Sequence, residues 1–145
     1  HHAVAHDTAG LAVQDAGRQI RTGQIQGSDS AQFRNAVCKE VSLLLSCGAG
    51  GTLQIDVESF SGYGGVSYKN PLNADGTMNT GLDNYSPGAA CSVVLVRAFY
   101  AWPVWAPGLV WFLANMTDAN GSRAHLLSAA TAFRNEPFST ATGGC

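Results

Sequence analysis

The fold is decided by the stretch Cys91-Ser92-Val93-Val94-Leu95-Val96-Arg97-Ala98-Phe99-Tyr100-Ala101-Trp102. Its alternate positions are apolar on both sides, with Val94, Val96, Ala98, Tyr100 and Trp102 on one face and Val93, Leu95 and Phe99 beside Arg97 on the other. A strand that is apolar on both faces is typical of the interior of a sheet. Pro103 ends the strand, because proline has no N–H to donate to a ladder. We therefore expect a partner strand on either side.

Two further segments alternate with the period of a strand. In residues 53–58, Leu53, Ile55 and Val57 alternate with polar side chains, and residues 125–135 alternate less strictly. We expect Arg97 and Arg134 to lie opposite Asp56 or Glu58 on a solvent-facing side of the sheet. An exposed pair contributes only about 0.2–1 kcal/mol, so Arg97→Ala is expected to lower the melting temperature by a few degrees at most.

Two helices are predicted before the first strand. Residues 3–22 carry a stripe of small side chains, Ala5, Ala9, Ala12 and Ala16, which favours close packing on the chain's own sheet or on a neighbouring helix. The second helix has an apolar face of Phe33, Val37, Val41, Leu44 and Leu45. Helices followed by strands predict an α+β fold with the helices on one face of a small antiparallel sheet.

Length and charge limit the class of protein. The 145 residues predict one domain, 1–145, and a net charge of −2 without a basic stripe argues against nucleic-acid binding. No stretch approaches the roughly 18 apolar residues of a membrane helix. The opening pair His1-His2 is interpreted as a tag remnant, which implies that the natural N-terminal segment is missing.

Four cysteines, Cys38, Cys47, Cys91 and Cys145, are separated by 9, 44 and 54 residues. Zinc sites usually contain ligands two to four residues apart, so disulfides in an oxidising compartment are the better interpretation. Spacing alone leaves all three connectivities open.

No catalytic residue, metal site or cofactor is predicted. His6 and His125 are the histidines considered for a hydrolytic triad, and neither lies near a Gly-x-Ser-x-Gly motif. The segment from Asn73 to Asp83 contains Asp75 and Asn79 but lacks the first aspartate and the bidentate glutamate of a calcium loop, so turns are favoured there.

Two segments remain open to more than one interpretation. Residues 60–90 are rich in Gly, Asn, Ser and Pro, and form either a functional surface loop or a region containing a short hairpin. The aromatic side chains Trp102, Trp105, Trp111 and Phe112 form either a lid over one end of the sheet or an exposed contact for a partner protein or a membrane surface.

Five segments resemble, in order, the TadE-like family of tight-adherence (type IVc) pilus assembly proteins. They are residues 15–24, 33–38 with Cys47, 94–97, 100–104 and 131–138. The most specific strings are Arg21-Thr22-Gly23-Gln24 and Phe133-Arg134-Asn135-Glu136-Pro137-Phe138. Cys91, Cys145 and residues 60–90 match no family string.

The resemblance implies a pilin-like, disulfide-bonded periplasmic domain of a minor pilin or pseudopilin. Such a protein is anchored in the bacterial inner membrane by a preceding helix, which residues 3–22 would continue, and it can enter the extracellular pilus. Its partners are other pilus subunits and inner-membrane pilus assembly proteins, and its contacts here would be the alanine stripe and the aromatic segment. The alternative is a secreted or surface adhesive or ligand-binding module that uses residues 60–90, with calcium as a candidate ligand.

The resemblance also implies a Cys38–Cys47 bridge, which leaves Cys91 to pair with Cys145. In an unbroken helix nine residues separate Cys38 from Cys47 by about 13.5 Å, whereas bridged Cα atoms lie within about 7 Å. This pairing therefore predicts that the second helix breaks between Lys39 and Leu43.

Overall fold

The computed structural model describes residues 2–22, 24–25, 30–42, 47, 53–104, 107–118, 120–137 and 145, with only the backbone of residues 2–6, 8 and 9. Its elements follow in chain order. They are α1 (His2–Arg21), α2 (Ser30–Val41), β1 (Leu53–Phe60), the 3-10 helix η1 (Tyr63–Gly65), β2 (Val93–Pro103), α3 (Val110–Leu113), β3 (Met116–Thr117) and β4 (Arg123–Arg134). The α+β class is confirmed.

The sheet contains four antiparallel strands in the order β1-β2-β4-β3. β2 pairs with both β1 and β4, so the interior position predicted for it is confirmed. The register places Arg97 opposite Asp56 on one side and opposite Ala130 on the other. The short strand β3 was not predicted, because two residues carry no measurable alternation.

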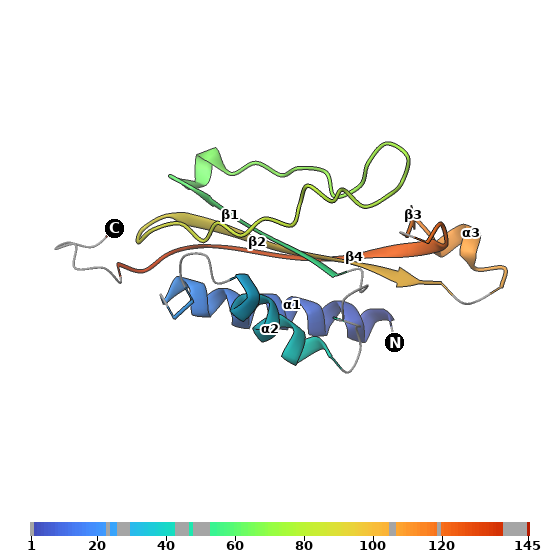
Figure 1. Ribbon diagram of the computed structural model, residues 1–145, viewed down its shortest axis with the longest axis horizontal. Coiled ribbons are helices and arrows are strands. Elements are labelled where there is room, and N and C mark those ends of the chain that lie inside the picture. The colour runs from blue at the N-terminus through green and yellow to red at the C-terminus, as the bar shows by residue number, and fades with distance from the viewer. Residues whose placement is uncertain are drawn as a thin grey trace.

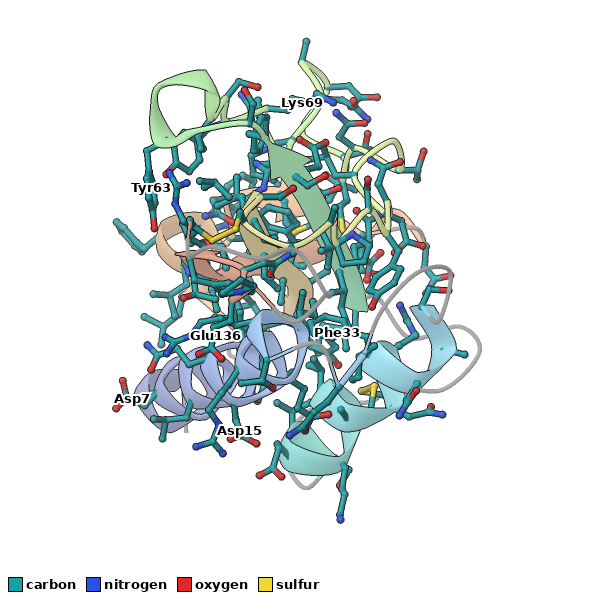
Figure 2. The ribbon with its side chains drawn as sticks, turned by 90° about the vertical axis from the view of Figure 1, so that its left-hand side faces the viewer. Asp7, Asp15, Phe33, Tyr63, Lys69 and Glu136 are labelled. Atoms are coloured by element: carbon teal, nitrogen blue, oxygen red, sulfur yellow. A yellow bond between two sulfur atoms is a disulfide. The ribbon has the colours of Figure 1, made fainter. Side chains whose placement is uncertain are left out.

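Buried side chains from both helices and three strands form one apolar cluster between α1, α2 and the sheet (Figure 1). The fully buried members include Val13, Ala16 and Ile20 from α1, Phe33, Val37 and Val41 from α2, and Val57, Val94 and Val96 from the sheet. Figure 2 shows Phe33 between α2 and the sheet, while Asp7 and Asp15 lie on the outer side of α1.

α1 packs closely against β4. A Cβ atom built on Gly17 would lie 2.9 Å from the ring of Phe133 and 3.3 Å from the methyl group of Thr131. At the end of the same seam the backbone amide of Glu136 donates to the carbonyl of Arg21 over 2.9 Å. α1 therefore runs in the same direction as β4.

Two glycines of α1 should respond oppositely to the same change. Gly10 has no atom within 4 Å of an added Cβ, so Gly10→Ala is expected to raise the free energy of unfolding by about 1 kcal/mol through helix propensity. Gly17→Ala should lose that gain by displacing the Phe133 ring. Urea denaturation of both variants checks this, and equal stabilisation by both would contradict the close seam.

The other face of the sheet is covered by residues 61–90, which lie across it on the side away from the helices (Figure 1). Asp56 and Arg97 lie beneath this segment and are 0 % and 4 % exposed. The prediction of a solvent-facing polar side is therefore wrong. Arg134 is also displaced from its predicted partners, because it lies opposite Val93 and its guanidinium sits 5.7 Å from the ring centre of Tyr63.

Candidate functional site

A buried ion pair fixes residues 61–90 to the sheet. Arg97 Nη2 lies 2.7 Å from Asp56 Oδ2, and Arg97 Nη1 donates to the carbonyl oxygen of Lys69 over 2.8 Å. Asp56 Oδ1 accepts a hydrogen bond of 3.1 Å from the side-chain amide of Asn84. Lys69 and Asn84, two distant points of residues 61–90 (the covering segment), are thus joined to one ion pair on β1 and β2. The geometry is that of a structural clamp and not of an open acid–base pair.

The edge of β1 gives a second attachment for this segment. The amide of Val57 donates to the carbonyl of Asn84, and the amide of Ser86 donates to the carbonyl of Val57, both over 2.8 Å. Tyr85 thereby pairs with Val57 as a parallel bridge. The segment covers the edge of β1 as well as a face of the sheet, which limits edge-to-edge pairing with other chains.

The turn chemistry predicted for residues 73–77 is confirmed. Leu72 and Met78 form an antiparallel bridge, and the amide of Asn73 donates to the carbonyl of Thr77 over 2.8 Å. Asp75 Oδ1 accepts from both the hydroxyl and the amide of Thr77, and these bonds lower the pKa of the Asp75 carboxyl. The short hairpin, one of the two alternatives for residues 60–90, corresponds to the Leu72–Met78 bridge and the turn that it closes.

Asp83, the last candidate calcium ligand, faces another partner. Its carboxylate lies 3.9 Å from Arg34 Nη1 of α2. Within the described ranges no group of three or more His, Cys, Asp or Glu side chains is placed to hold a metal ion.

A hollow of about 400 Å³ lies between β1 and the covering segment. Its wall includes an ion pair in which Lys69 Nζ lies 3.1 Å from Glu58 Oε1. The lining residues are Glu58, Ser59, Phe60, Ser67, Lys69, Asn84 and Ser86. The hollow is open, and its wall combines polar side chains with Phe60, so it could hold a small hydroxylated ligand.

The aromatic segment divides into a packed part and an exposed part. Trp102 is half-buried against the core and meets Tyr100 edge-on at 6.2 Å between ring centres. Trp111 and Phe112 on α3 are 79 % and 84 % exposed, so the lid interpretation is wrong for them. Trp105 lies outside the described residues. We name the exposed group Leu109, Trp111, Phe112 and Leu113 the apolar tip.

The described half of the alanine stripe is buried. Ala12 and Ala16 are buried in the chain's own core, which corrects their prediction as partner contacts, and the side chains of Ala5 and Ala9 lie outside the described part. On another side of α1, Leu11 is 68 % exposed. Close packing against the sheet explains the small side chains.

Two disulfides join Cys38 to Cys47 and Cys91 to Cys145, with Cα–Cα distances of 5.9 and 5.4 Å. This is the expected pairing. α2 ends at Val41, inside the interval where the helix break was predicted, while Leu44 and Leu45 lie outside the described residues. Two disulfide bonds are consistent with an oxidising compartment.

Sequence reasoning missed Asn135, which holds the far end of the covering segment. Its side chain is buried, and Nδ2 donates to the carbonyls of Pro87 and Ala89 over 2.9 and 3.0 Å. A polar residue directly after β4, next to the apolar side chain of Phe133 two positions earlier, was the available signal.

Of the two histidines considered for a hydrolytic triad, only His125 has a side chain within the described part of the chain. His125 Nδ1 lies 2.6 Å from the carbonyl oxygen of Leu113 and links β4 to α3, while the side chain of His6 lies outside the described part.

Among the described helices, none has the length and apolar character needed to cross a bilayer. Comparison with protein families, curated proteins and solved structures finds no match to this chain.

Proposed function

We propose that this chain is a non-catalytic, minor pilin- or pseudopilin-like subunit of a tight-adherence pilus. In this proposal its helices cover one face of the sheet as in a pilin, and a membrane helix precedes α1. The domain then lies at the periplasmic face of the inner membrane or in the extracellular pilus. Its partners are other pilus subunits and inner-membrane assembly proteins.

The supporting observation is that the two most specific family-like strings meet in space. Arg21 of the first string forms an ion pair with Glu136 of the second, with 3.3 Å between Nε and Oε1, although 115 residues separate them. A backbone hydrogen bond joins the same two residues, and Gly17 faces Phe133 along the seam. Both strings thus lie along the contact between α1 and β4, and this contact is a physical reason for them to occur in the same chain.

Assembly should use surfaces that the domain leaves exposed. Leu11 projects from α1 away from the buried face formed by Ala12, Val13 and Ala16. In a filament whose subunits pack through their N-terminal helices, this side chain would face a neighbouring subunit. An exposed leucine does not stabilise the isolated domain, so its replacement separates assembly from folding.

Leu11→Asp in the full-length protein is expected to reduce piliation about as strongly as deletion of the protein itself. The melting temperature of the domain should stay within a few degrees. The matched control is Asn35→Asp, which adds the same charge at an exposed position of α2, away from the proposed contact of α1. Pili are counted by electron microscopy in cells lacking the native copy. Unchanged piliation both in Leu11→Asp and in the deletion strain would contradict the proposal.

The hollow beside Lys69 supports a second candidate, a ligand-binding module. Its mixed lining, with the ring of Phe60 among serine hydroxyls, suits a glycan, and Glu58 and Lys69 supply a charged pair at its wall. Titration calorimetry with calcium and with simple glycans separates the two functions. Heat that disappears in Lys69→Ala would favour the binding module, since an assembly subunit should bind neither.

A further inference from the structure

The apolar tip is an exposed apolar group at one end of the molecule. Trp111 and Phe112 are the most exposed of its members, and Leu109 and Leu113 are about half exposed beside them. The tip lies past the end of the long strands, where α3 leads into β3 (Figure 1). Four large apolar side chains in water at a single point call for a partner surface.

The N-terminal end of α1 lies at the same end of the molecule as the tip. Gly17 meets Phe133 and Thr131, and α1 runs parallel to β4. A helix rises about 1.5 Å per residue and a strand about 3.3 Å, so the start of α1 reaches roughly the level of His125. His125 contacts the carbonyl of Leu113 in α3. Figure 1 shows α3 and the N-terminus at one end and the C-terminus at the other.

The charges around the tip suit a lipid headgroup layer. The guanidinium of Arg123 lies 5.4 Å from the ring centre of Trp111 and is exposed with it. The nearby Asp118 carboxylate is held in its own turn, where Oδ1 accepts the amides of Asn120 and Ser122 over 2.9 and 2.8 Å. Tryptophan with a neighbouring cation is favoured at the boundary between headgroups and acyl chains.

The small area of the tip argues for lipid over a protein partner. A stable protein interface buries about 800 Å² on each side, whereas an aromatic side chain contributes about 150–250 Å². Two aromatic residues and two half-exposed leucines fall short of that area. Insertion into a bilayer needs no complementary shape, and it gains from each apolar side chain separately.

We propose that the apolar tip inserts into the lipid–water interface of a membrane and holds this end of the domain against it. That the membrane is the one carrying the chain's own anchor rests on the proposed function. The lipid binding itself rests on the tip alone.

Flotation with vesicles of phosphatidylethanolamine and phosphatidylglycerol tests this on the chain of 145 residues. The double variant Trp111→Ser/Phe112→Ser is expected to lower the bound fraction at least about tenfold. Tyr63→Ser is the matched control, since Tyr63 is also exposed and also carries an arginine, Arg134, over its ring at the opposite end of β4. It should bind as the unchanged chain does.

Two outcomes would overturn the inference. One is equal vesicle binding by the unchanged chain and the double variant, including the absence of binding in both. The other is self-association in sedimentation that the double variant abolishes without any vesicle binding, which would make the tip a protein interface. Vesicle binding together with normal piliation both in Leu11→Asp and in the deletion strain would refute the pilus proposal and leave the lipid tip standing.

Discussion

Arg97→Ala is expected to lower the free energy of unfolding by about 3–5 kcal/mol, because Asp56 would remain buried without its cation. The carboxylate is fully buried, and Arg97 Nη2 lies 2.7 Å from it. The change also removes the hydrogen bond to the carbonyl of Lys69, so residues 61–90 lose one of their attachments. Since native proteins have only about 5–15 kcal/mol in total, this is a large fraction of the free energy of unfolding. Urea denaturation at neutral pH measures the loss.

Two matched variants separate burial from charge. Lys69→Ala removes the partner of Glu58 from a pair in which the lysine is 57 % exposed, and should cost about 1 kcal/mol. Asp56→Leu combined with Arg97→Met removes both buried charges and should recover much of the stability lost in Arg97→Ala. If Arg97→Ala cost no more than Lys69→Ala, the buried clamp would be refuted.

Removing the Cys91–Cys145 bridge as Cys91→Ser/Cys145→Ser should lower the free energy of unfolding by about 4 kcal/mol. The bridge closes a separation of 54 residues, and the loop-entropy relation gives about 4 kcal/mol for that length. Without it, the contacts of Asn135 and the packing of Arg134 over Tyr63 still join the end of β4 to the covering segment. Denaturation of the oxidised protein and of the serine variant gives the difference.

The Cys38–Cys47 bridge is the internal control, because it closes a separation of only nine residues. The same relation gives about 2.6 kcal/mol for Cys38→Ser/Cys47→Ser. Removing the Cys91–Cys145 bridge, which closes the longer loop, should therefore lower the free energy of unfolding more than removing Cys38–Cys47. The reverse order would show that chain entropy does not dominate the effect of either bridge.

The sheet could be predicted from sequence where alternation is strong. The two apolar faces of β2 fixed its interior position, and the alternation of Leu53, Ile55 and Val57 identified β1. Alternation also predicted Arg97 opposite Asp56 or Glu58, and the register places it opposite Asp56. It could not show what lies above that face, because residues 61–90 have no period and their attachments are backbone carbonyls and single side chains such as Asn84.

The candidate contact residues were harder to predict than the strands. A stripe of small side chains predicts close packing but not its partner, and Ala12 and Ala16 turned out to face the chain's own core. For Trp111 and Phe112 the lid was the favoured interpretation over an exposed contact, and it was wrong, since a helix of four residues has too few positions to define a buried face. The resemblance gave the disulfide pairing, which spacing alone left open.

Photo-cross-linking in intact piliated cells tests the assembly role most directly. A photoreactive residue replaces Leu11 in the full-length protein, with the same residue at Tyr63 as the control, because both positions are exposed and Tyr63 lies on the opposite side of the sheet. The account predicts adducts with other pilus subunits from position 11, identified by mass spectrometry, and few or none from position 63. Absence of every pilus subunit from the position 11 adducts, together with normal piliation after deletion of the protein, would contradict it.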